Sequence, residues 1–184
     1  MFPWKRTQIP LEQRCHQQVV WVAECANVPE KLKKRARAAA RKLGPASAEM
    51  LAGLGYPEWD SPKAVRHKFP TLGHWIGARN QAVFEILYNF REDALLALRS
   101  VAFSDSGWKQ SNAIEILCRF ASEGLSREEI LEEIKRELPR FSLYTRVCAM
   151  HLIIGQARKN TAMQAILDEL LTIPELREAY YELD

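Results

Sequence analysis

The heptapeptide FEILYNF at positions 84–90 returns as IEILCRF at positions 114–120, an offset of 30 residues. Both copies carry a glutamate among bulky apolar residues, and each is followed by a charged turn and a second segment with helical apolar spacing. Self-similarity at a period of about 30 to 40 residues is typical of stacked helical hairpins, because one hairpin cannot bury its apolar face alone. We therefore expect an all-α chain built from repeated hairpins.

The composition is that of a globular protein. The chain has 184 residues, of which 47% are hydrophobic and 27% charged, enough to bury one sizeable core. Its most apolar window, 147–155, is much shorter than the roughly 20 residues of a membrane-spanning helix, and the first residues lack the apolar stretch of a secretory signal. We expect no membrane association and a cytoplasmic location.

The cysteines are spaced widely and form no C-x-x-C pair. They are Cys15, Cys25, Cys118 and Cys148. All four fall in segments with helical spacing, so we expect reduced thiols in the core; a zinc site or disulfides are the alternatives.

The charge is distributed unevenly along the chain. Residues 1–80 carry 14 Lys or Arg and 6 Asp or Glu, a net charge of +8, whereas residues 81–184 carry 12 and 17, a net charge of −5. This asymmetry favours anionic partners for the first part and cationic partners for the second, or head-to-tail self-association. The alternative is that these charges only solvate helix faces.

Three helices are predicted in residues 1–54. The first runs from about 10 to 27, the second starts with Pro29 in its first turn and stops at Gly44, and a short third helix follows Pro45. Seven of the thirteen residues from 30 to 42 are Lys or Arg. A solvated helix face is the favoured interpretation, and an anion-binding surface is the alternative. Its candidate residues are Lys33, Lys34, Arg37 and Arg41.

Residues 55–73 are irregular, because Pro57, Pro62 and Pro70 interrupt the pattern. Aromatic residues such as Tyr56 and Trp59 argue against simple disorder. The segment is predicted to be either a packed linker that closes the helical stack or a recognition element. The predicted organisation is therefore 1–54, 55–73 and 74–184, together forming one compact domain.

Residues 74–184 contain three predicted helix pairs and a final acidic helix after Pro174 that caps the stack. The pairs are 74–90 with 91–103, 107–122 with 127–138, and 141–157 with 161–171. Ser126-x-x-Glu129 has the form of a capping box before the second helix of the middle pair. The helix at 141–157 is apolar nearly all round, as expected of a helix between neighbours.

These pairs resemble HEAT and armadillo-type repeats over about residues 74–172. The resemblance rests on Asp105-x-x-Trp108-Lys109, with Arg79-x-x-Ala82 and Arg146-x-x-Ala149 at corresponding places of the flanking pairs. It implies a right-handed stack of antiparallel helical hairpins with an N-terminal helical extension, and a protein- or nucleic-acid-binding surface. A generic helical bundle is the alternative.

Arg79, Lys109 and Arg146 are predicted to form a cationic row, because equivalent repeat positions project from equivalent rows of the surface. Such a row suits phosphates or an acidic protein partner. In the family that the chain resembles, a turn Asp and a basic residue form a ladder between repeats. The alternative is that these three residues belong to such a ladder between repeats.

Catalysis has little support in the sequence. None of the four histidines lies in a recognised catalytic or metal-binding motif, and we expect no metal, cofactor or enzymatic activity. HEAT-like alkylpurine DNA glycosylases are the one enzymatic precedent, echoed faintly by Asp105 beside Trp108.

The preferred prediction is non-catalytic protein–protein interaction, as an adaptor, an assembly subunit or a toxin-neutralising immunity protein. Tyr56, Trp59 and Trp108 are predicted interface aromatics, although core packing explains Trp75 and Trp108 equally well. Nucleic-acid binding through the basic N-terminal half is the runner-up.

Overall fold

The computed structural model describes residues 9–54, 67–104 and 107–183. In this part of the chain there are ten α-helices, three short 3-10 helices and no strand, so the all-α prediction is confirmed for it. The chain divides into two compact units, residues 1–90 and residues 91–184, each described by itself below.

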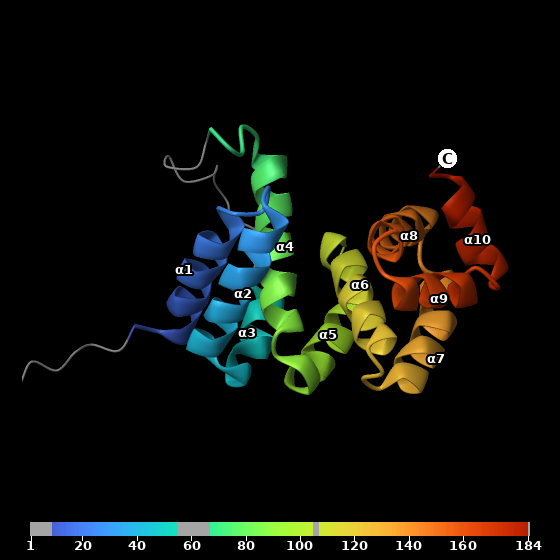
Figure 1. Ribbon diagram of the computed structural model, residues 1–184, viewed down its shortest axis with the longest axis horizontal. Helices are drawn as coiled ribbons and strands as arrows, with labels where there is room; N and C mark the ends of the chain where they lie inside the picture. Colours follow the sequence, from blue (N-terminus) through green and yellow to red (C-terminus); the bar gives the residue numbers. More distant parts are fainter. Residues whose placement is uncertain (1–8, 55–66, 105–106, 184) are drawn as a thin grey trace, which may run out of the picture. The chain divides into compact units, whose positions relative to one another are not determined.

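The first unit is built around one buried helix. It contains α1 (Leu11–Ala23), α2 (Pro29–Leu43), the 3-10 helix η1 (Pro45–Ser47), α3 (Ala48–Gly53) and α4 (Leu72–Tyr88). α4 packs against α1, α2 and α3, and α1 also packs against α2 (Figure 1). α4 therefore lies with the N-terminal helices, and the compact units do not coincide with the predicted segments 1–54 and 74–184.

Local signals fix the ends of these helices. Pro29 occupies the first turn of α2, and Gly44 ends the helix with a φ of 77°, a conformation that glycine adopts without steric cost. The Gly44 N–H donates to Ala40 O at 2.9 Å. The Thr71 hydroxyl caps α4 by accepting from the His74 N–H at 3.2 Å. α1 is shorter than predicted, because residues 24–27 form turns after Ala23.

The second unit also surrounds one buried helix. It contains the 3-10 helix η3 (Arg91–Ala94), α5 (Leu95–Ala102), α6 (Trp108–Ser122), α7 (Arg127–Glu137), the 3-10 helix η4 (Leu138–Arg140), α8 (Leu143–Ala157), α9 (Thr161–Leu170) and α10 (Pro174–Tyr181). α6 packs against α5, α7, α8 and α9, while α8 also packs against α9 and α10. The predicted contacts of α6 with α7 and of α8 with α9 are thus present, whereas the predicted pairing of 74–90 with 91–103 joins the two units and stays a prediction.

The first copy of the heptapeptide, 84–90, begins in α4, and its last two residues follow the end of that helix. The second copy, 114–120, lies entirely within α6. Ile86 and Leu87 are fully buried in the first unit, and Ile116 and Leu117 are 1% and 0% exposed in the second. The glutamate of each copy is also buried. Each copy is therefore the core helix of its own unit, which explains why the same residue types recur.

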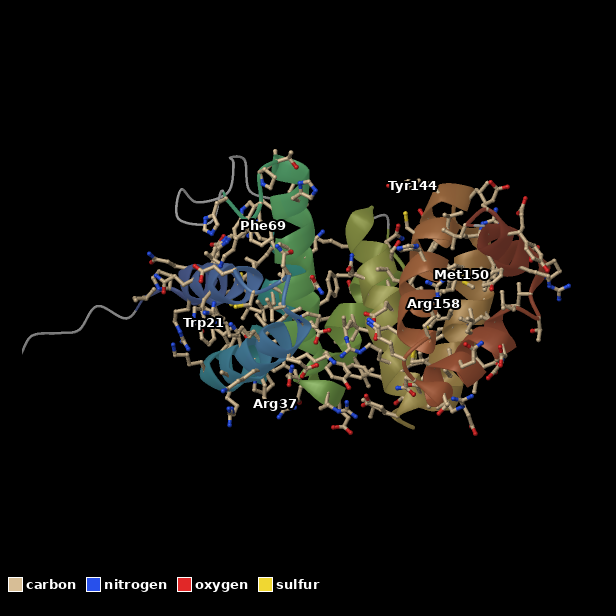
Figure 2. All side chains as sticks on the ribbon, turned by 45° about the horizontal axis from the view of Figure 1, so that its top comes forward. Trp21, Arg37, Phe69, Tyr144, Met150 and Arg158 are labelled. Atoms are coloured by element: carbon tan, nitrogen blue, oxygen red, sulfur yellow. The ribbon has the colours of Figure 1, made fainter. Side chains whose placement is uncertain are left out.

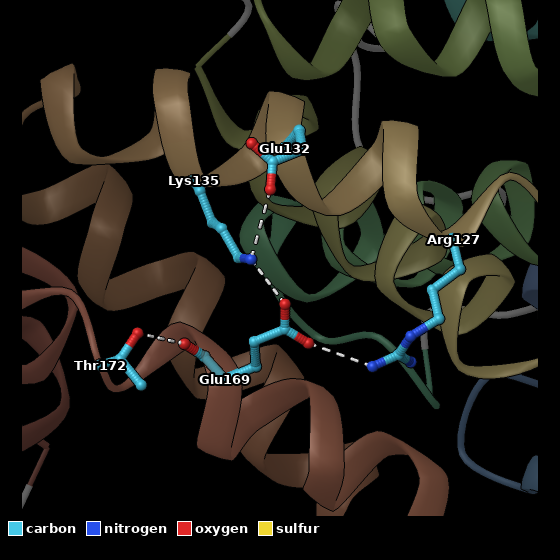
Figure 3. A network of polar contacts seen from close by, with 5 residues as sticks. All are labelled: Arg127, Glu132, Lys135, Glu169 and Thr172. Atoms are coloured by element: carbon cyan, nitrogen blue, oxygen red, sulfur yellow. Dashed lines mark hydrogen bonds and ion pairs between the residues drawn. The ribbon is translucent and has the colours of Figure 1, made fainter.

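A network of ion pairs connects α7 to α9 in the second unit (Figure 3). Glu169 of α9 accepts from Arg127 Nη2 at 3.1 Å and from Lys135 Nζ at 2.5 Å. Lys135 Nζ also lies 3.6 Å from Glu132 Oε1. Arg127 and Lys135 of α7 thereby hold a neighbouring helix.

The predicted capping box at Ser126 and Glu129 is wrong. Ser126 has a φ of 43°, and its side chain makes no capping hydrogen bond to α7. The reason is the tight turn after α6, in which Gly124 has a φ of 85° and the Leu125 N–H donates back to Phe120 O at 3.0 Å. This turn forces Ser126 into the left-handed region, which removes the extended geometry that an N-cap needs.

α8 is less enclosed than its sequence indicates. Its buried side chains are those of Ala149, Met150, Ile153 and Ala157. Leu143 and Tyr144 are exposed, and Cys148 is half-buried. The core-thiol prediction is therefore confirmed for Cys15, Cys25 and Cys118 but is wrong for Cys148, although all four are free thiols.

Candidate anion-binding surface on α2

α2 is anchored by an apolar stripe that fixes which of its side chains face solvent. Leu32, Ala36 and Ala39 are at most 2% exposed, and they recur at the spacing of one helix face. The polar residues between them must therefore lie on the opposite side of the helix.

Six cations lie on that opposite side, and we call them the cationic surface of α2. All six are exposed: Lys31, Lys33, Lys34, Arg37, Arg41 and Lys42. The four predicted anion-binding residues all belong to this surface, and Figure 2 labels Arg37 among its side chains. Positions 33, 37 and 41 are four residues apart and so follow one another along the helix.

The charges of this surface have almost no internal compensation. Lys33 Nζ lies 4.0 Å from Glu30 Oε1, and both side chains are strongly exposed. Lys34, Arg37 and Arg41 have no ion-pair or hydrogen-bond partner among the described residues. Like charges gathered without counter-charges produce a positive potential that attracts anions.

Arg35 has a different role, because it joins α2 to α1. Its guanidinium carbon lies 4.9 Å from the centre of the Trp21 ring, and its Nη1 donates to Glu24 Oε2 at 3.1 Å. Trp21 is still 37% exposed. An aromatic side chain therefore stands beside the cationic helix, a neighbour that sequence reasoning missed because Trp21 lies on a different helix.

A pocket of about 480 Å³ lies beside the C-terminal end of α2. Arg14 and Gln18 of α1 and Lys42 of α2 are among its lining residues. Arg14 Nη2 donates to Lys42 O at 3.1 Å, and the buried Gln18 Oε1 has no hydrogen-bond partner. Arg14 and Gln18 of α1 are thus two further polar side chains beside the cationic surface of α2.

Arg79, by contrast, points into the first unit. It is 6% exposed, and its Nη2 lies 3.3 Å from His16 Nδ1. A guanidinium only donates, so His16 Nδ1 is the acceptor and the proton of the neutral imidazole is on Nε2. Burial lowers the pKa of Arg79.

The other two members of the predicted cationic row belong to the second unit. Arg146 Nη1 donates to Glu175 O at 3.0 Å and lies 3.4 Å from Glu178 Oε2. These partners are on α10, so Arg146 ties α8 to the last helix. Lys109 is half-buried in α6. Since Arg79 lies in the other unit, the row as a whole stays a prediction.

The predicted interface aromatics are only partly described. Tyr56 and Trp59, together with Asp105, lie outside the described residues, and so does the side chain of Trp108. Trp75 is 1% exposed, and its ring centre lies 5.4 Å from that of Phe69. Trp75 therefore has the core-packing role, and Phe69 shows that the end of the 55–73 segment packs onto α4.

The described residues 9–54, 67–104 and 107–183 lack two kinds of feature. They contain no group of three or more His, Cys, Asp or Glu side chains arranged to hold a metal ion. They also contain no helix with the length and apolar character needed to cross a bilayer.

Comparisons with known protein families, with curated proteins and with solved structures found no match for this chain.

Proposed function

We propose that this chain is a non-catalytic helical binding module that engages an acidic protein through the cationic surface of α2. An adaptor, a subunit of an assembly and an immunity protein all fit this description. The HEAT-like stacking of hairpins is part of the same proposal. It is supported by the burial of Ile86 and Leu87 in the first heptapeptide copy and of Ile116 and Leu117 in the second.

The observation that carries the proposal is the absence of counter-charges around Lys34, Arg37 and Arg41 among the described residues. Elsewhere among the described residues, several cations hold helices together, as in the network at Glu169 and in the ion pair of Arg146 with Glu178. Cations that stabilise nothing internally cost self-repulsion. An external anionic partner would give that charge a role, through steering and complementary pairing.

A protein partner is favoured over a nucleic acid by the surroundings of α2. Single-strand binding usually combines cations with aromatic faces that are free to stack. α2 has no aromatic residue, and Arg35 already covers one face of Trp21 at 4.9 Å. Carboxylates on a protein surface need only the exposed Lys and Arg side chains.

The test is capture of the partner with two baits. The wild-type chain and the variant K34E/R37E/R41E are used for affinity purification from the native host, followed by mass spectrometry. We expect an acidic protein that is retained by the wild type and lost by the variant, and whose retention decreases with salt. Equal retention by both baits would contradict the role of α2. The variant R158E/K159E controls for changes in exposed charge alone.

Nucleic-acid binding is the second candidate, and the exposure of Trp21 beside α2 is the observation that favours it. A gel shift with single- and double-stranded DNA and RNA over a salt series separates the two candidates. The protein proposal predicts only weak, nonspecific retention. A submicromolar, salt-sensitive shift that is lost in K34E/R37E/R41E would replace the acidic protein with a nucleic acid.

A reducing, cytoplasmic location is also part of the proposal. It is supported by four cysteines that are all free thiols, since secreted proteins tend to pair theirs.

A further inference from the structure

The uncompensated positive charge of α2 has a counterpart on α10, the last helix of the second unit. Glu175, Glu178 and Glu182 lie on or directly after α10, and all three side chains are exposed. Glu178 Oε2 lies 3.4 Å from Arg146 Nη1, so this carboxylate already has a cation beside it. The side chains of Glu175 and Glu182 have no ion-pair or hydrogen-bond partner among the described residues. α10 therefore offers two uncompensated carboxylates to an external partner.

These two carboxylates have the same spacing as two of the unpaired cations of α2. Glu175 and Glu182 are seven residues apart, as are Lys34 and Arg41. Seven residues are nearly two turns of an α-helix, about 10.5 Å along its axis, so the two members of each set lie on one side of their helix. Glu182 keeps helical backbone angles, with φ −70° and ψ −6°. Two such helices laid side by side can therefore form both ion pairs at once.

An exposed aromatic side chain lies next to the carboxylates of α10. Tyr181 is 65% exposed, and Tyr180 meets its ring edge-on with the ring centres 5.8 Å apart. Tyrosine is a common anchor of protein interfaces, and the face of its ring attracts a guanidinium. Arg37, which lies between Lys34 and Arg41 on α2, supplies such a group. The α10 surface thus fits α2 by more than its charge.

The charge of the rest of the chain agrees with a contact between copies. Residues 1–80 have a net charge of +8 and residues 81–184 a net charge of −5, so the first part of one copy attracts the second part of another. Arg177 is an exposed cation of α10, but its Nε donates to Leu171 O at 3.0 Å, back towards the turn before the helix. Both complementary surfaces are present in every copy, which an unrelated acidic protein would have to provide separately.

We infer that the acidic partner of the cationic surface of α2 is the α10 surface of a second copy of this chain. Lys34 and Arg41 of one copy pair with Glu175 and Glu182 of the next, and Arg37 stacks on Tyr181. This identity of the partner rests on the proposed function, in which α2 binds an acidic protein. The contact joins two different surfaces and is therefore heterologous.

Sedimentation equilibrium of the full chain over a concentration series measures this self-association. Exposed ion pairs contribute little each, so the association should be reversible and sensitive to salt. We expect the average mass at low salt to rise with concentration above the 21.2 kDa of one chain. Salt at about 0.5 M should lower the association constant by about tenfold.

Charge-reversed variants identify the two surfaces. K34E/R41E and E175K/E182K should each lower the association constant by at least about tenfold. Mixed in equal amounts, they should associate again, because the intact α10 of the first variant meets the intact α2 of the second. K34Q/R41Q and E175Q/E182Q, which only remove charge, are used if a reversed variant does not fold.

Two further variants separate docking from net charge. E92K/D93K makes the same charge change as E175K/E182K at two exposed carboxylates that precede α5, and it should alter the association constant by less than about twofold. Y181A leaves the charge unchanged and should lower the constant by about threefold. A loss in E92K/D93K equal to that in E175K/E182K would show that net charge governs association, which overturns the docking of α2 on α10.

The identity of the partner and the proposed function can fail separately. A wild type that stays at 21.2 kDa throughout the series, or a mixture of the two reversed variants that associates no more than its components, would overturn the second copy as the partner. Capture of a different acidic protein through α2 would then leave the proposed function standing. If K34E/R41E keeps both self-association and capture, α2 has no binding role and both proposals are wrong.

Discussion

α2 and α7 are both strongly charged helices with an apolar stripe, and they differ in where their charges are satisfied. Arg127 and Lys135 of α7 meet the same carboxylate, Glu169 of α9 (Figure 3). Lys34, Arg37 and Arg41 of α2 meet no carboxylate among the described residues. Charge in α7 stabilises the fold, whereas charge in α2 remains available to something outside it.

The difference shows that charge density alone does not identify a binding surface. Both helices appear in the sequence as amphipathic segments with many ionisable residues. What separates them is the supply of counter-charges on neighbouring helices, which only the packing decides. Four experiments test this contrast.

The largest effect is expected for the buried core helix of each unit. I86A and I116A each remove a side chain that is at most 1% exposed, so each should lower the free energy of unfolding by about 2–5 kcal/mol. Urea unfolding measures this. L96A, at a side chain 74% exposed, should change stability by no more than about 0.5 kcal/mol. Unequal costs of the two isoleucine variants would contradict the equivalence of the two heptapeptides.

Charge reversal on α2 should weaken binding to a polyanion without weakening the fold. K34E/R37E is expected to lose about 100-fold in affinity for heparin at low salt, because like charges then face the ligand. Titration calorimetry measures the affinity, and a thermal melt should show no loss of stability. R158E/K159E changes two exposed cations of the second unit by the same charge. An equal loss of affinity in this control would show that net charge, rather than α2, governs binding.

On the α7 side the expected effect falls on stability instead. E169Q removes the carboxylate shared by Arg127 and Lys135, and it should cost about 1 kcal/mol because Glu169 is partly exposed. Chemical unfolding at low salt and at about 1 M salt checks this, since screening should shrink the difference. E128Q makes the same charge change at an exposed glutamate of α7. If E128Q costs as much as E169Q, the network is not the source of the stability.

The smallest effect concerns alkaline pH. The hydrogen bond to Glu169, together with nearby carboxylates, raises the pKa of Lys135 above its ordinary 10.5. A raised pKa in the folded state means that this stabilisation is fully present below pH 10.5 and is lost as the pH rises through the folded value. We therefore measure the free energy of unfolding below and above the pKa of Lys135 in the folded protein. As the pH rises, this free energy should fall further in the wild type than in K135R, by at most about 0.5 kcal/mol. A K135R profile parallel to that of the wild type would refute this.

Much of the fold is predictable because its signals are local. Pro29, Gly44 and the apolar spacing of α2 act within a few residues, and the structure places that helix where they indicate. The heptapeptide copies likewise identify the two buried helices, because a run of bulky apolar residues has no other stable location.

Features set by packing are not predictable in this way. Ser126 carries the sequence of a cap, but the short turn after α6 dictates its backbone conformation. Trp21 reaches Arg35 only through the packing of α1 on α2. Cys148 lies on a helix that looks buried all round, and its exposure depends on which neighbours α8 has.

The order of charges along α2 has one more consequence. Glu30 stands in its first turn and Arg41 and Lys42 in its last, an arrangement that opposes the partial charges at the two ends of a helix. The macrodipole therefore offsets part of the repulsion among the cations at the C-terminal end. Arg41 and Lys42, which offer positive charge to a ligand, therefore also favour the helical state of the segment, so at that end recognition and local folding do not compete.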